Sequence, residues 1–261
     1  MRLRNAPLVH VLAEIRFSPV LSIEKYVPAI QDALRELGYP RLIEGTVQTV
    51  TVMAEAPPQV SIRPQWAFLQ AEKTAGAVLS ESSLVLHTTR YSTVEPFLES
   101  LHRVAAVLSE VVRIDLVERI GMRYIDRIPP DEDGDLGPFV IPGLVGFPMD
   151  DMGGIGALWT ETVGRTPEGV LVVRSMLLPP GQIVPPDLDP APVINQDAKQ
   201  HDTVGLALEF DHYTVFDTEV FPFDSESVVQ HARKLHAALR RAFDIAVTPY
   251  AIERWGPWEE I

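Results

Sequence analysis

The chain has 261 residues, of which 46% are hydrophobic and 22% charged, an ordinary composition for a globular protein with a sizeable core. Its formal net charge of −14 argues against nucleic acid or an anionic membrane as a partner, because both require a positive surface. The absence of cysteine excludes disulfides, thiolate metal sites and thiol nucleophiles. No apolar run approaches membrane-spanning length and the N-terminus has no signal-type apolar stretch, so we expect a cytoplasmic protein and no membrane partner.

The first part of the chain predicts a strand, a helix and a meander of strands. Residues 7–17 alternate between apolar and polar side chains, which is typical of a half-buried strand. A helix is expected over 27–37, where apolar residues recur at helical spacing and Pro28 suits the first turn. Residues 45–90 then predict several strands, the last two forming a hairpin that turns near residues 81–83.

The middle of the chain predicts a second helix followed by a long strand. The helix is expected over 93–111 and opens with Ser92-Thr93-Val94-Glu95, which matches a capping-box pattern. Residues 113–128 alternate and predict a strand, and residues 129–153 are rich in proline, glycine and aspartate, as loops are.

The last part of the chain repeats this order of strands and then a helix. Residues 153–178 predict a hairpin, and 179–202 form a long proline-rich loop of a kind that is often functional or disordered. A strong strand is expected over 203–216. A long helix is expected over 225–243, with Asp224 as its N-cap.

These elements predict the fold class. Strands outnumber helices and most are joined by short turns, so we expect an α+β protein with a mostly antiparallel sheet and three long helices packed on one face. A single domain over 1–261 is expected. The loop at 129–153 leaves open a division into two similar halves, 1–128 and 150–261.

The strand "RIDLVERIGMRYIDRI" carries an arginine at every fourth position on one of its faces. Ile120, Met122 and Tyr124 share the first face, which is expected to be buried. The other face carries three arginines, Arg119, Arg123 and Arg127, with Gly121 among them. Such a face is either a solvated surface with cross-strand ion pairs or a binding site.

Residues 205–211 offer a complementary face. Glu209 and Asp211 share that face with Gly205 and Ala207, whereas Leu206, Leu208 and Phe210 point the other way. If the two strands are close together, the small residues leave space above the sheet that arginines and carboxylates surround. Arginine suits planar, bidentate recognition of carboxylate or phosphate, so this face is a candidate groove. The alternatives are ordinary salt bridges or a covering helix over the small residues.

Other motifs give little support for a metal or for catalysis. Asp131, Asp133 and Asp135 have the first spacings of an EF-hand loop, but the glycine and the twelfth residue do not fit, which favours an acidic turn. "GGIG" at 153–156 precedes a strand rather than opening a helix, and His231 and His236 are not spaced as a ligand pair. We therefore expect no metal, no cofactor and no recognisable catalytic set.

Two tryptophans close the chain, Trp255 and Trp258. Large aromatic residues near a terminus usually dock onto the core, so we expect that here. An exposed pair would instead indicate a partner surface.

Three segments, "NAPLVHVLAEIRF", "RIGMRYIDRI" and "LALEFDHY", resemble recurrent motifs of a sporadically distributed bacterial family of uncharacterised proteins of about this length. The resemblance spans most of the chain. It implies no particular activity, because none is established for that family.

The function expected from the residues is binding, of a protein partner or an anionic small molecule, through Arg119, Arg123, Arg127, Glu209 and Asp211. The alternative is an enzyme that acts on a phosphorylated or carboxylated small molecule, with the arginines as anchors and Glu209 or Asp211 as general base. A broad, shallow surface favours the first and a deep pocket the second. The sequence does not indicate the oligomeric state.

Overall fold

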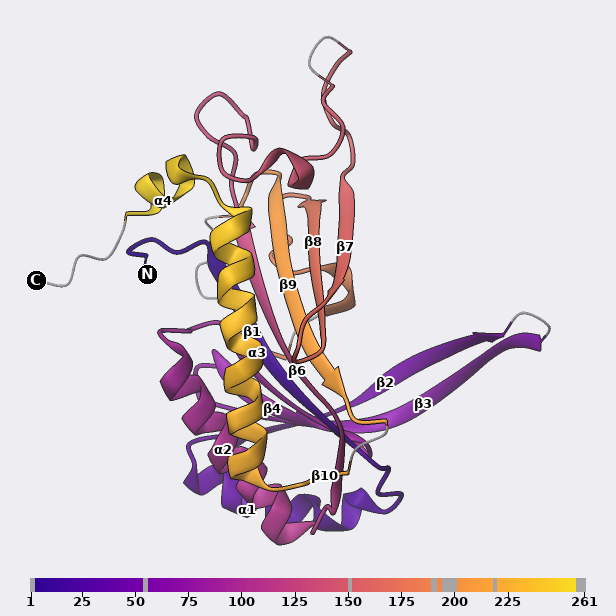
Figure 1. Ribbon diagram of the computed structural model, residues 1–261. Helices are drawn as coiled ribbons and strands as arrows, with labels where there is room; N and C mark the ends of the chain where they lie inside the picture. Colours follow the sequence, from indigo (N-terminus) through magenta and orange to yellow (C-terminus); the bar gives the residue numbers. More distant parts are fainter. Residues whose placement is uncertain are drawn as a thin grey trace, which may run out of the picture.

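The computed structural model describes residues 3–53, 56–149, 152–188, 192–193, 201–217 and 220–256. Within them the chain forms one antiparallel sheet whose order runs β2-β3-β4-β5-β1-β6-β9-β8-β7, with β10 paired to β6 (Figure 1). In chain order the strands are β1 (Leu8–Phe17), β2 (Arg41–Met53), β3 (Ala56–Leu69), β4 (Ala75–Leu79), β5 (Ser83–Thr88), β6 (Leu116–Ile128), β7 (Trp159–Arg165), β8 (Val170–Leu178), β9 (Gly205–Val215) and β10 (Phe221–Pro222). The α+β class and the antiparallel sheet are confirmed.

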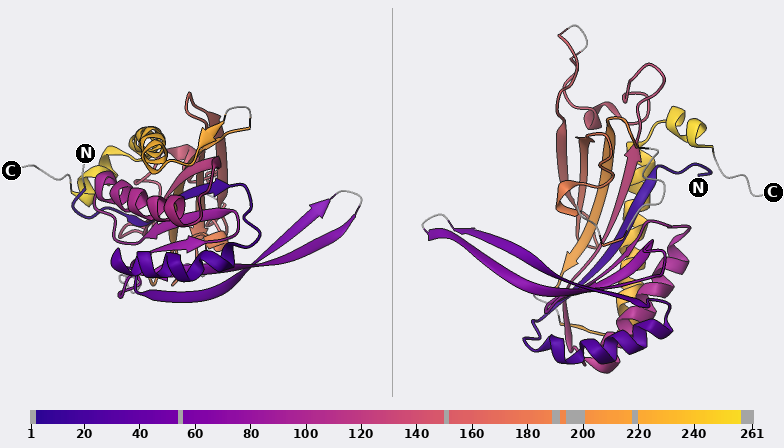
Figure 2. Two further views of the ribbon diagram at one scale, coloured as in Figure 1. Left: turned by 90° about the horizontal axis from the view of Figure 1, so that it is seen from below. Right: turned by 180° about the vertical axis from the view of Figure 1, so that it is seen from behind.

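Helices pack on one face of the curved sheet, and the other face carries no α-helix in the described residues (Figure 2). The α-helices are α1 (Val27–Glu36), α2 (Val94–Val111), α3 (Ser225–Ala246) and α4 (Pro249–Trp255), and the 3-10 helices are η1 (Ile23–Tyr26), η2 (Pro142–Leu144) and η3 (Pro186–Leu188). The expectation of three long helices needs correction. The first of them has only 10 residues, and α4 is an additional helix whose 7 residues are too few to show a periodic pattern.

The buried face of the central strands is the one that the alternation predicts. Ile120, Met122, Tyr124, Leu206, Leu208 and Phe210 are all buried beneath the helices, none more than 9% exposed. Trp255 is also buried and stacks on Phe139, so its predicted docking is confirmed. Trp258 lies outside the described residues.

The two predicted helix caps have different outcomes. The carboxylate of Asp224 accepts a hydrogen bond from the backbone N–H of Ser227 at 2.8 Å and caps α3 as expected. The capping box at the start of α2 does not form: the N-cap is Thr93, whose side chain makes no cap hydrogen bond, and Glu95 pairs instead with Arg233 of α3. A tertiary ion pair therefore takes the place of the expected local hydrogen bonds.

The strand order places the candidate residues together. β1 and β6 are paired at the centre of the sheet, β1 lies next to β5, and β6 lies next to β9. Each central strand therefore borders the last strand of a meander, and each meander is followed by a long helix, α2 or α3. This topology groups β6 with the second meander. It also makes β1, β6 and β9 a continuous open face, beside which the β2–β3 hairpin extends outward (Figure 1).

Candidate functional site: a groove on the open face of the sheet

A groove of about 1150 Å³ lies on the face of the sheet opposite the helices. Side chains of β1, β5 and β6 form its floor. The base of the β2–β3 hairpin and the 3-10 helix η3 border it. Arg119, Gly121, Arg123 and Asp211 are among its lining residues. The sequence-predicted face is therefore hollowed in the folded protein.

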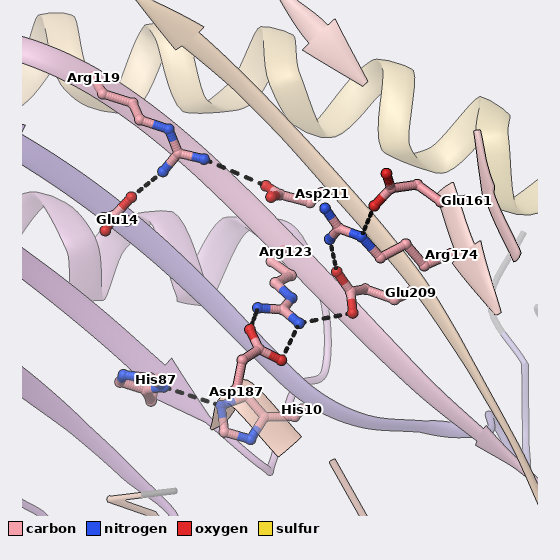
Figure 3. Close-up of polar contacts among 10 residues, drawn as sticks. All are labelled: His10, Glu14, His87, Arg119, Arg123, Glu161, Arg174, Asp187, Glu209 and Asp211. Atoms are coloured by element: carbon pink, nitrogen blue, oxygen red, sulfur yellow. Dashed lines mark hydrogen bonds and ion pairs between the residues drawn. The ribbon is translucent and has the colours of Figure 1, made fainter. Parts of the chain in front are cut away.

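Arg123 is the centre of the polar contacts in this groove (Figure 3). Its guanidinium donates two hydrogen bonds to the carboxylate of Asp187 in η3, at 2.6 and 3.1 Å, and one to Glu209 at 2.7 Å. The arginine side chain is 11% exposed, whereas Asp187 is 61% exposed. Arg123 thus holds a carboxylate bidentately on the solvent side and a second carboxylate beneath it. Its Nε is buried and has no acceptor among the described residues.

Glu209 joins Arg123 to a second arginine. Its side chain is fully buried, and its other carboxylate oxygen accepts from Arg174 of β8, which in turn donates to Glu161 of β7. Both oxygens of Glu209 are therefore engaged in charge-assisted hydrogen bonds (Figure 3). Burial of this carboxylate is tolerated because two guanidinium groups surround it.

Arg119 forms a separate cluster of charges. It pairs with Glu14 of β1, and its Nη2 lies 3.8 Å from a carboxylate oxygen of Asp211. The guanidinium also stacks 4.2 Å from the ring centre of Tyr213. Gly121 was expected to leave space for a ligand, but a Cβ there would lie 3.1 Å from the Arg119 guanidinium. The protein's own arginine occupies that space.

The structure separates Arg127 from the other predicted site residues. It is 2% exposed and donates to the backbone carbonyls of Leu178, Gln182 and Thr203, which lie at the end of β8, after β8 and before β9. A Cβ on Gly205 would lie 1.6 Å from its Nη1, so this glycine accommodates the arginine. Arg127 therefore fastens a loop to the sheet and does not face the groove.

Two histidines lie beside the groove. Nε2 of His10 and Nδ1 of His87 are 3.0 Å apart, and both residues are buried. Burial, with the nearby charge of Arg123, lowers the pKa of His10 to about 4; burial and His10 lower that of His87 to about 3. Both rings are consequently neutral at pH 7, and the pair shares one hydrogen bond.

The carboxylates of the groove differ in their proton affinity. Burial raises the pKa of Asp211, and the charges of Arg119 and Arg123 offset only part of that effect. Although partial burial acts in the opposite direction, hydrogen bonds and the charge of Arg123 hold the pKa of Asp187 below its usual range. Among the residues that the structure describes, no group of three or more His, Asp or Glu side chains is arranged to hold a metal ion.

Most partners in these ion pairs were not predicted from the sequence. Glu14 was visible as a polar residue on its strand, but nothing indicated that it would face Arg119. Asp187 lies in a proline-rich loop without periodicity, and Glu161 and Arg174 lie on a hairpin with no distinctive motif. The pairing of β8 with β9 aligns Arg174 with Glu209, and it is this pairing that brings Arg174 to the site.

Comparisons with known proteins assign no family to the chain. No protein-family model matches the chain, and no curated protein matches it. The fold and site define an α+β protein with an open antiparallel sheet and an ion-paired groove. No helix in the described part of the chain is long and apolar enough to cross a membrane.

Proposed function

We propose that this is a binding protein whose groove receives an acidic segment of a partner protein. The observation that carries the proposal is the bidentate pair of Arg123 with Asp187, a largely exposed carboxylate from a short 3-10 helix. Asp187 stands where a carboxylate of a partner would stand. Such a partner would displace it and take over both hydrogen bonds.

The charge of the groove supports an acidic partner despite the net charge of the chain. Its described lining residues include five cationic and four anionic side chains, Arg16, Arg63, Lys73, Arg119 and Arg123 against Glu14, Glu81, Asp187 and Asp211. Displacing Asp187 changes this balance to five against three. The groove would then present a local positive field to an incoming carboxylate.

The size of the groove favours a polypeptide over a small substrate. Its volume of about 1150 Å³ exceeds the roughly 300–1,000 Å³ of ordinary ligand pockets. It also crosses several strands rather than ending in a single cavity. These features fit the broad surface expected for a protein partner.

The enzymatic alternative has less support. A general base needs an accessible lone pair near the substrate, and both oxygens of Glu209 are bound to arginines within a fully buried side chain. Asp211 is the more accessible of the two carboxylates, but its neighbour Arg119 is already paired with Glu14. In neither arrangement is the carboxylate both accessible and free of an arginine that is already ion-paired within the chain.

The test is selection of peptides from a random library displayed on phage, followed by fluorescence anisotropy with the purified chain. We expect enrichment of acidic peptides, at least 10-fold weaker binding in Arg123→Gln, and tighter binding in Asp187→Asn. The control is Arg35→Gln, which removes an exposed arginine of α1 on the other face of the sheet and should leave binding unchanged.

Two results would contradict the proposal. If the peptides bind Arg123→Gln as tightly as they bind the native chain, the peptide-binding surface is not the groove at Arg123. Citrate binding that depends on Arg123, without any peptide binding, would identify a small anion as the ligand. A matched melting temperature for each variant is required, because Arg123→Gln also removes a partner of buried Glu209. The cytoplasmic location and the bacterial family remain predictions from the sequence.

A further inference from the structure

A second pocket lies on the opposite, helix-covered face of the sheet. It occupies about 620 Å³ between the N-terminal segment, the start of α2, the strands β6 and β9, and the C-terminal half of α3. This volume is within the range of small-molecule sites. No part of the proposed function involves it.

The walls of this pocket are largely apolar. They are formed by side chains from the N-terminal segment, β9 and α3, namely Leu3, Pro7, Leu8, Phe210, Leu239 and Phe243. Two tyrosines, Tyr91 and Tyr124, add aromatic surface with ring centres 5.4 Å apart. An apolar pocket with few polar groups is the usual form of a ligand site, and those few polar groups define the ligand.

Asp126 is a buried polar side chain of this pocket that lacks a partner among the described residues. It lies on β6, lines the pocket and is 2% exposed. Its carboxyl makes no hydrogen bond or ion pair with any residue that the structure describes. Burial accordingly raises its pKa to about 8. Placing a carboxyl in an apolar site without a partner is costly, and such groups concentrate at functional sites.

Tyr124 links two other polar side chains of the pocket, Tyr91 and His236, through its hydroxyl. The hydroxyl of Tyr124 lies 3.1 Å from the Tyr91 hydroxyl and 3.1 Å from Nδ1 of His236. Burial and the charge of Arg240 lower the pKa of His236, so it is neutral at pH 7. Arg240 is itself paired with Asp244 at 2.9 Å. Arg4 also lines the pocket, and neither arginine is hydrogen-bonded or ion-paired to Asp126 in the described part of the chain.

We propose that this pocket binds a small molecule with a primary ammonium group on an apolar body, and that the ammonium pairs with Asp126. A cation is the partner that a buried carboxylate lacks. The aromatic rings of Tyr91 and Tyr124 are suited to contact an ammonium group and its carbon frame. The apolar side chains of β9 and α3 receive the rest of the ligand.

The proposal predicts a proton balance. At pH 7 most molecules of the empty protein hold Asp126 as the neutral acid, given its pKa near 8. An arriving ammonium group favours the carboxylate, so the carboxyl proton leaves to solvent and the ammonium keeps its own. Close to one proton should therefore be released for each ligand bound.

The experiment is isothermal titration of the full chain with 2-phenylethylamine at pH 7, in two buffers that differ in ionisation enthalpy. We expect a Kd below about 1 mM, proton release close to one, and at least 10-fold weaker binding in Asp126→Asn. Asp32→Asn, the same change at an exposed position of α1, should bind as the native chain does. Leu8→Trp, which keeps Asp126 and fills the pocket, should also lose binding.

Neutral and anionic probes of the same shape provide the opposing outcomes. The proposal is overturned if 2-phenylethanol or 3-phenylpropionate binds as tightly as the amine, if Asp126→Asn binds normally, or if the amine does not bind. None of these results bears on the groove, because the peptide measurements depend on Arg123 on the other face of the sheet.

Discussion

Gly205 and Arg127 show how one residue can be required by another that lies far away in the sequence. Among the described residues, Arg127 is the largest of the side chains that are almost fully buried, and it fits only because position 205 has no Cβ. Its three hydrogen bonds to backbone carbonyls satisfy the guanidinium in place of a carboxylate. A regular spacing of arginines along one strand therefore includes residues with different roles.

Gly205→Ala should destabilise the protein by more than about 2 kcal/mol, because the added methyl group would overlap the Arg127 guanidinium and approach the Ile128 carbonyl at 2.7 Å. Gly143→Ala is the control, since nothing lies within 4 Å of the corresponding Cβ, and it should cost less than about 1 kcal/mol. Urea unfolding measures both. Equal losses in the two variants would mean that Arg127 can move aside.

Asp126 should make stability fall as pH rises. Its folded-state pKa is raised to about 8 from an ordinary value of 3.8, so the stabilising effect of the bound proton is complete below pH 3.8 and is lost as pH approaches 8. Within that window the contribution should fall by about 1.4 kcal/mol per pH unit. Because buried His10 and His87 act in the opposite direction, the test is the difference between variants: the free energy of unfolding of Asp126→Asn minus that of the native chain should rise across this window in urea unfolding at a series of pH values. A difference that does not change with pH would mean that the Asp126 carboxyl is solvated or has a partner in the folded protein.

At the scale of elements, local sequence signals located helices better than they located caps. The periodic segments at 27–37, 93–111 and 225–243 correspond to α1, α2 and α3 with ends that differ by three residues at most. The capping box at Ser92 does not form because the helix starts one residue later, with Thr93 as its N-cap, and Glu95 pairs with Arg233 on α3, an interaction that local spacing cannot show. Whether a side chain caps its own helix therefore depends on the charged partners that a neighbouring helix brings close to it.

Asp224→Ala should destabilise the protein by about 1 kcal/mol, because it removes the acceptor for the Ser227 backbone N–H at the start of α3. Thr93→Ala is the matched control at the start of α2, where the side chain makes no cap hydrogen bond, and should change the free energy of unfolding by less than half of that. Thermal and urea unfolding give both values. A larger loss in Thr93→Ala would contradict the cap assignment.

At the scale of the whole molecule, the central β1–β6 pair joins the two meanders into one sheet, and α2 packs against α3 above it. Cutting between the halves would leave β1 or β6 with an unpaired edge and an uncovered apolar face. We therefore expect one cooperative unfolding unit, as the single-domain interpretation predicts.

Unfolding should give the same urea midpoint for probes at both ends of the chain. Trp66 on β3 and Trp255 on α4 are both buried, and each can serve as the only tryptophan once the others are replaced by phenylalanine. Coincident fluorescence transitions that match the loss of helical circular dichroism are the expected result. Two separated midpoints would show instead that the halves fold independently.

The sequence by itself determined which apolar residues of the central strands are buried and where the long helices lie, because side-chain alternation and helical spacing are local properties. The burial of Ile120, Leu208 and the other apolar residues on the same strand faces was predicted from the two-residue alternation alone. The tertiary structure decided which charges meet. Arg123 acquired Asp187 from a loop without pattern, Arg127 was buried by the segments around it, and Asp126 was enclosed beneath α3 without a described partner. Strand pairing and loop placement join residues more than 50 positions apart, and such contacts have no local signature in the chain.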